Sequence, residues 1–130
     1  MEDVAKHIVG TWRLVHQIKI NADGTTEYPY GEDAIGYISY SDTGIMSVHI
    51  SRKSRAEVKD IADLKHDYLA YFGKYEIDSE KQVVRHLVEG ELFPGGHAQV
   101  LVRKYRFDGD LMYLKTVDGS NLEILWQRVR

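Results

Sequence analysis

Six residues of this 130-residue chain have side chains of the types that could bind or transform a small molecule without help from a cofactor. An imidazole moves protons near neutral pH, a phenol donates a hydrogen bond to a developing enolate, and a guanidinium stabilises negative charge. The same groups suit passive binding of a carboxylate or a phenol equally well. The candidates are His16, Tyr71, Tyr75, His86, Arg103 and Tyr105.

Other kinds of chemistry find no support in the sequence. There is no cysteine, which excludes disulfides, thiolate nucleophiles and thiolate metal ligands. The histidines at 7, 16, 49, 66, 86 and 97 form no HxH or HxxxH pair, so we expect no metal site. GELFPGGH (90–97) matches neither nucleotide fingerprint, and no GxSxG is present, so we expect no cofactor and no acyl hydrolysis.

Short runs of alternating apolar and polar residues, separated by turn residues, position these side chains. The turns NADG (21–24), SDTG (41–44), DGD (108–110) and DGSN (118–121) consist of residues that tolerate positive φ. Short turns between successive strands favour an up-and-down meander. We predict eight strands, at 10–20, 34–41, 45–51, 71–78, 82–90, 98–107, 110–117 and 121–129.

One segment departs from this pattern. Ser54 and Glu57 match a capping box, and Val58, Ile61 and Ala62 follow at roughly helical spacing. The sequence therefore predicts one short helix over about 55–67, between the third and fourth strands. We expect this helix across or beside one opening of the barrel described next.

Eight meandering strands leave two bare edges unless the sheet closes. We therefore predict a single all-β domain over residues 1–130, an eight-stranded up-and-down antiparallel β-barrel. Its last strand then pairs with its first, which brings Arg128 over the ring of Trp12 as a cation–π contact. We interpret Trp12, Trp126 and Arg128 as a structural plug at one end, with Gly10 allowing the chain to pass close by.

The period of two assigns faces to most strands. Charged residues mark the outer faces, which leaves Tyr71, Tyr75, His86, Arg103 and Tyr105 pointing inward, while the facing of Tyr37, Tyr40 and His49 stays open. His16 shares the face of Trp12 and Leu14, so it is predicted to look into the space above the plug. A buried guanidinium requires a carboxylate, water or an anionic ligand. No inward carboxylate is evident, and this favours a wet ligand cavity over a filled barrel.

The chain resembles a known superfamily in its strand motifs. Gly-x-Trp on the first strand with Arg at the end of the last is similar to the calycins, the lipocalins and fatty-acid-binding proteins. Over most of its length the chain looks like the bacterial and fungal lipocalin-like domain family, and this resemblance implies the fold more than an activity. The shortened GGHAQ after Pro94 departs from that family. The matching stretches are GTWRLV (10–15), YPYGEDAIGYISYSDTGIMSV (28–48), AYFGKYEID (70–78), VVRHLVEGELFP (83–94), VRKYRF (102–107) and LWQRV (125–129).

Bulk properties limit the partners. A net charge of -3 gives no attraction to nucleic acid or an anionic membrane, and no run approaches the length of a membrane span. The N-terminal MEDVAKHIVGTW lacks the apolar region of a secretory signal, so we expect a cytoplasmic protein.

Three functions are compatible with the sequence. The first is binding of a small hydrophobic or amphipathic molecule, which is either neutral or anionic, in the barrel cavity. The second is a cofactor-free isomerase or cyclase that acts on a hydrophobic carbonyl compound in the same cavity. The third is an interaction protein with a filled barrel, which self-associates, for example as a homodimer, through outer positions such as Val100 and Val102.

Overall fold

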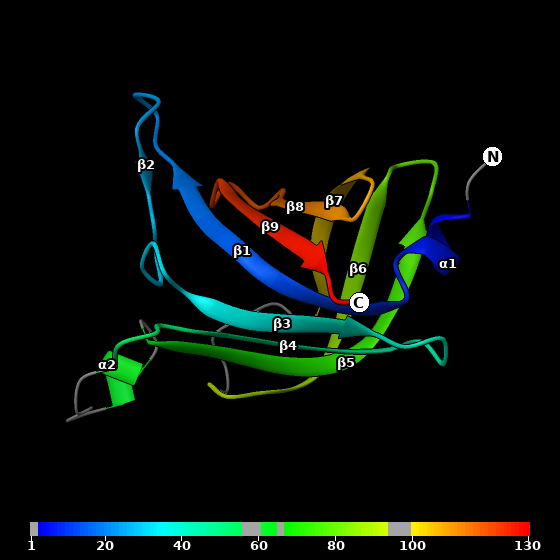
Figure 1. The fold of residues 1–130 in the computed structure, drawn as a ribbon, viewed down its shortest axis with the longest axis horizontal. Coiled ribbons are helices and arrows are strands. Elements are labelled where there is room, and N and C mark those ends of the chain that lie inside the picture. Colours follow the sequence, from blue (N-terminus) through cyan, green and yellow to red (C-terminus); the bar gives the residue numbers. More distant parts are fainter. Residues whose placement is uncertain (1–2, 56–60, 65–66, 94–99) are drawn as a thin grey trace.

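Nine strands and two short helices make up the computed structural model, which describes residues 3–55, 61–64, 67–93 and 100–130 (Figure 1). The helices are α1 (Val4–His7) and α2 (Ile61–Leu64). The strands are β1 (Gly10–Ile20), β2 (Thr26–Glu27), β3 (Ile35–Tyr40), β4 (Ile45–Ser51), β5 (Tyr68–Asp78), β6 (Val83–Glu91), β7 (Val100–Asp108), β8 (Leu111–Thr116) and β9 (Leu122–Arg128).

Eight of the strands close into an antiparallel barrel in the order β1-β3-β4-β5-β6-β7-β8-β9, and β9 pairs with β1 to complete it. β2 pairs only with the last residues of β1, so it forms a small hairpin beside the ring. The predicted all-β, eight-stranded up-and-down barrel is confirmed. α2 lies within the predicted helix, while residues 56–60 and 65–66, including the capping residue Glu57, fall outside the described part of the chain.

A β-bulge in β1 changes which residues face the interior. Leu14 lies opposite Trp126, but the next paired residue is His16 opposite Leu125, so Val15 has no partner in β9. An extra residue in one strand reverses the alternation that follows it. The prediction that His16 shares the inner face of Leu14 is therefore wrong. Gln17 takes that place, only 6% exposed and paired with the buried Ile124.

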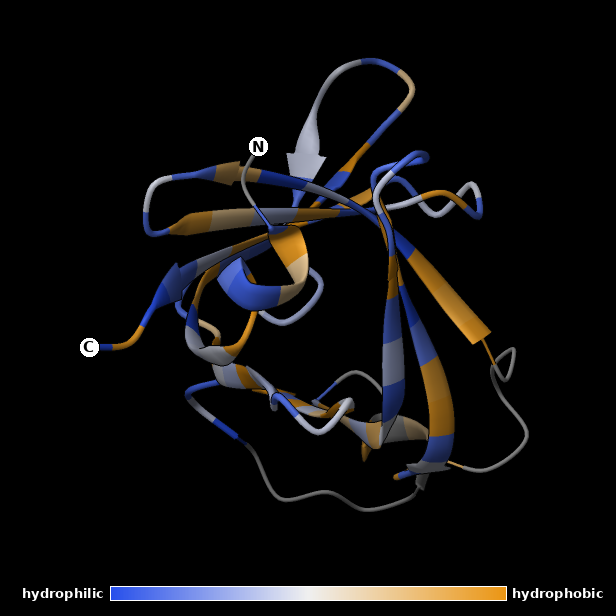
Figure 2. Ribbon diagram, turned by 90° about the vertical axis from the view of Figure 1, so that its right-hand side faces the viewer, coloured by the Kyte–Doolittle hydropathy of each residue, from blue (hydrophilic) through white to orange (hydrophobic). Residues whose placement is uncertain are grey.

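The two buried tryptophans, Trp12 and Trp126, lie at one end of the barrel, which we call the closed end. α1 lies across this end (Figure 2), and the indole Nε1–H of Trp12 donates to the carbonyl of Ile8, 2.9 Å away. The Arg128 guanidinium carbon sits 4.2 Å from the centre of the Trp12 ring, as the strand order led us to expect. The guanidinium also donates to the carbonyls of Val9 and His7, which ties the N-terminal segment to β9.

Gly10 has a structural reason to be glycine at the start of β1. Its φ of +137° lies in a region that side-chain-bearing residues rarely adopt. A Cβ added there would come 3.0 Å from the Nη1 atom of Arg128. The glycine thus leaves room for the guanidinium that covers Trp12.

Candidate functional site

A chain of three hydrogen-bonded aromatic side chains lies inside the barrel. His86, on the inner face of β6, is 1% exposed. Its Nδ1 atom lies 2.7 Å from the hydroxyl oxygen of Tyr71 on β5, and its Nε2 atom lies 2.6 Å from the hydroxyl oxygen of Tyr40 on β3. A neutral imidazole has one donor and one acceptor nitrogen, so one hydroxyl donates to the ring and the other accepts from it. We call Tyr40, His86 and Tyr71 the tyrosine–histidine chain.

All three side chains of the tyrosine–histidine chain are uncharged near neutral pH. Burial, with a smaller contribution from the positive charge of Arg103, lowers the pKa of His86 to about 3. Burial raises the pKa of Tyr71 to about 12, although the nearby guanidinium opposes this rise. Burial also raises the pKa of Tyr40 well above its ordinary value. Loss or gain of a proton is therefore unfavourable at each of the three side chains.

Arg103 brings a permanent positive charge to one end of the tyrosine–histidine chain. It lies on β7 between two buried partners, Val84 on β6 and Thr116 on β8, which places it on the inner face. Its Nη1 atom donates to the carbonyl of Val102, 3.2 Å away. The ion pairs formed within the described residues do not include it. Most of its hydrogen-bond donors thus lack a protein acceptor among the described residues.

One carboxylate nevertheless lies close enough to Arg103 for the positive charge to affect its pKa. Asp118, in the turn between β8 and β9, has a lowered pKa. Hydrogen bonds from Ser120 are the main cause, and the charge of Arg103 makes a smaller contribution. Asp118 is already committed to the Ser120 side chain, whose hydroxyl donates to it over 2.6 Å. It therefore shapes the turn, and Arg103 forms no ion pair with a carboxylate among the described residues.

Two of the predicted tyrosines belong to the closed end. The hydroxyl of Tyr75 donates to the carbonyl of Ser41 over 2.6 Å, and its ring packs edge-on against Tyr40, with 4.8 Å between the ring centres. Tyr105 packs against Phe107 with 5.5 Å between the ring centres. Both side chains contact residues of the core, and neither hydrogen-bonds to His86.

The structure thus brings together Tyr71, His86 and Arg103 from the six predicted residues. Tyr75 packs beside them against Tyr40, whereas His16 and Tyr105 lie apart. His16 lies on the outer face because of the bulge. Two inner polar residues were missed, Tyr40 and Gln17. Tyr40 follows the buried Ile38 by two residues on β3, so the two side chains share a face. This spacing was the available signal for the inward facing of Tyr40. Nothing in the local sequence marked Gln17, because its facing depends on the register between β1 and β9.

Comparison with known families agrees with this geometry. Residues 9–128 match the family model for the lipocalin-like domain. The chain belongs to the lipocalin-like domain family. No curated protein sequence matches this lipocalin-like domain. A closed eight-stranded barrel of this family suggests ligand binding in general, because eight strands enclose just enough space for side chains or one small ligand.

The described residues also offer neither a cluster of metal ligands nor a membrane-spanning helix. No group of three His, Asp or Glu side chains in this part of the chain is arranged to hold a metal ion. None of its helices is long and apolar enough to cross a bilayer.

Proposed function

We propose that this lipocalin-like domain binds a small amphipathic molecule with an acidic group inside its barrel. The observation that carries the proposal is the inward guanidinium of Arg103, which has no carboxylate partner among the described residues. Enclosing such a charge is costly unless an anion or water completes its hydrogen bonds. A carboxylate is the natural complement, because it accepts two parallel hydrogen bonds from a guanidinium.

The neighbouring groups extend this polar site. The Tyr71 hydroxyl lies between His86 and Arg103, so it is placed to share the acidic group with the guanidinium. Because both nitrogens of His86 are occupied by hydroxyl groups, Tyr71 is held in one orientation before any ligand arrives. A preorganised polar site costs less to bind than one that must order its side chains.

The proposed site also borders the apolar interior. Four buried aliphatic side chains from three strands belong to the cluster that contains Tyr40 and against which Tyr71 packs: Val48, Ile50, Val84 and Leu114. Ligand sites commonly combine such an apolar lining with a few fixed polar groups. The proposed ligand therefore has a hydrocarbon body and one acidic end.

A cofactor-free isomerase or cyclase is the second candidate, and one observation favours it. Arg103 beside Tyr71 would stabilise the negative charge of an enolate as well as that of a carboxylate. The state of His86 argues for binding instead. With a pKa of about 3 and both nitrogens engaged, it is a poor general base at neutral pH.

Native mass spectrometry tests the proposal, by comparison of the gently purified protein with its denatured mass. We expect excess mass that disappears on denaturation, and we expect Arg103→Met to lose it. Arg13→Met, on the exposed outer face of β1, is the matched control and should retain it. Melting temperatures of both variants show whether the barrel still folds.

A defined probe covers the case in which the ligand is lost during purification. Calorimetric titration with decanoate and with decanol compares the same hydrocarbon body with and without an acidic group. We expect decanoate to bind more tightly, and Arg103→Met to remove the difference. Equal affinity of the two probes for the wild-type protein, or equal loss of binding and of folding in Arg103→Met, would contradict the proposal.

A further inference from the structure

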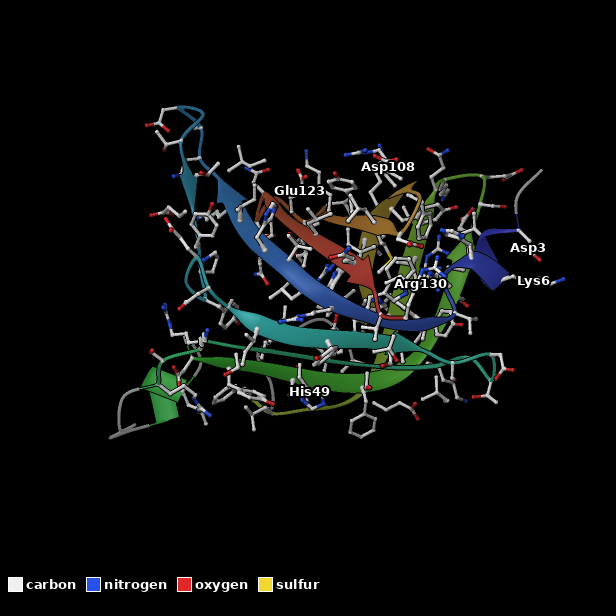
Figure 3. The ribbon with its side chains drawn as sticks, viewed as in Figure 1. Asp3, Lys6, His49, Asp108, Glu123 and Arg130 are labelled. Carbon is white, nitrogen blue, oxygen red and sulfur yellow. The ribbon has the colours of Figure 1, made fainter. Side chains whose placement is uncertain are left out.

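A hollow lies outside the barrel, on the outer face of β7, β8 and β9. It has a volume of about 590 Å³, which is within the usual range for small-molecule sites. Three positively charged side chains line it, Lys104 and Arg106 from β7 and Lys115 from β8. Glu123 on β9 is the one carboxylate among its lining residues, so positive charge exceeds negative charge there. Figure 3 places Glu123 on this side of the molecule.

The sheet register forces two of these cations together. Lys104 and Lys115 are direct partners in the β7–β8 pairing, so their Cβ atoms lie about 5 Å apart on the same face. Like charges that are directly opposite destabilise a sheet. None of the ion pairs within the described residues includes either lysine. The fold therefore places two lysines directly opposite each other. Glu123 on β9 is the other cross-strand partner of Lys115, and Lys104 has no directly paired carboxylate.

Aromatic side chains supply the remaining surface of the hollow. Arg106 is the partner of Tyr113, and its guanidinium carbon lies 3.8 Å from the centre of that ring. The stacking fixes the guanidinium against the sheet and leaves its edge available for hydrogen bonds. Tyr105 and Phe107 line the same hollow, where β7 extends beyond the first residue of β6.

We infer that this outer hollow binds an organic anion with an aromatic body, as a site separate from the barrel interior. Its acidic group lies between Lys104 and Lys115, where it relieves their mutual repulsion. The aromatic body lies against Tyr113, the outward-facing ring of the hollow, beside the stacked guanidinium of Arg106. Three cations beside an otherwise net negative protein suit a small anion better than a nucleic acid, which needs a longer basic surface.

Titration of the ¹⁵N-labelled full chain with phenyl phosphate, followed by amide chemical shifts, tests the inference. We expect saturable shifts at residues 104–107 and 113–115. The double substitution Lys104→Gln/Lys115→Gln should weaken binding about tenfold, because two screened charge contacts are lost. Lys74→Gln, an exposed lysine on β5, is the matched control and should bind as the wild type does.

A thermal melt keeps this test independent of folding. Because the double substitution removes both the opposed pair of like charges and the cross-strand pair of Lys115 with Glu123, its melting temperature should stay close to that of the wild type. Inorganic phosphate should bind more weakly than phenyl phosphate, since it lacks the ring. Three results would overturn the inference. The first is that the amide chemical shifts change only at inward residues, such as those near His86. The others are an unchanged affinity of the double variant for phenyl phosphate and equal affinities of the wild type for phenyl phosphate and inorganic phosphate.

Discussion

Trp12 and Trp126 offer a matched pair of substitutions, because both indoles are buried and their N–H groups differ. The indole N–H of Trp12 donates to the carbonyl of Ile8 over 2.9 Å. The indole N–H of Trp126 is enclosed and has no hydrogen-bond partner among the described residues. Substituting phenylalanine removes the same atoms at both sites, so the loss of packing is similar.

The difference between the two variants then reports the hydrogen bond together with the weaker cation–π contact that phenylalanine makes with Arg128. Trp12→Phe leaves the fully buried carbonyl of Ile8 without its partner, which costs about 1–3 kcal/mol beyond the loss of packing. Trp126→Phe removes a donor that was already unsatisfied, so part of its packing loss is recovered. We expect Trp12→Phe to be the less stable variant by about 2 kcal/mol or more. For a domain of this size the difference corresponds to roughly 6–10 °C in melting temperature.

Urea unfolding followed by far-ultraviolet circular dichroism measures both free energies of unfolding without depending on tryptophan fluorescence. Equal destabilisation, or a larger loss in Trp126→Phe, would refute the reasoning. That result would mean that the N–H of Trp126 has an acceptor in solution. In that case the cost of the substitution should change when the protein is stripped of bound small molecules.

Three further predictions follow from the same structure. In the folded protein His86 has a pKa of about 3, whereas in the unfolded chain its pKa is near 6.5. The free energy of unfolding should therefore fall by about 1.4 kcal/mol per pH unit below pH 6. Urea unfolding at several pH values should show that His86→Gln lacks this component. Gly73→Ala should prevent stable folding, because its Cβ would lie 2.0 Å from the backbone oxygen of Leu87. Gly90→Ala should be tolerated better, because its Cβ meets only the exposed ring of Phe72, which can rotate. The melting temperatures of the two variants test this difference. Gln17→Leu should change decanoate affinity measured by calorimetry while His16→Leu leaves it unchanged, and the opposite result would mean that the bulge is absent in solution.

Local patterns in the sequence were sufficient for the barrel and for half of the candidate site. Turn residues and period-two alternation are properties of neighbouring residues, so they identified the strands that close the sheet. Charged outer residues marked the facing of Tyr71 and His86, and the two outer cations of β7 left Arg103 on the opposite, inner face. The contact of Arg128 with Trp12 followed from the parity of an eight-stranded meander.

The tertiary structure decided what depends on pairing between distant strands. The bulge at Val15 arises in the register of β1 with β9, and one unpaired residue moved His16 outward and Gln17 inward. Tyr40 reaches His86 from three strands away, a contact that only the curvature of the barrel creates. The opposition of Lys104 and Lys115 is likewise a property of register. The sequence alone determined the elements and most of their faces, and the packing of strands far apart in the chain determined which side chains meet.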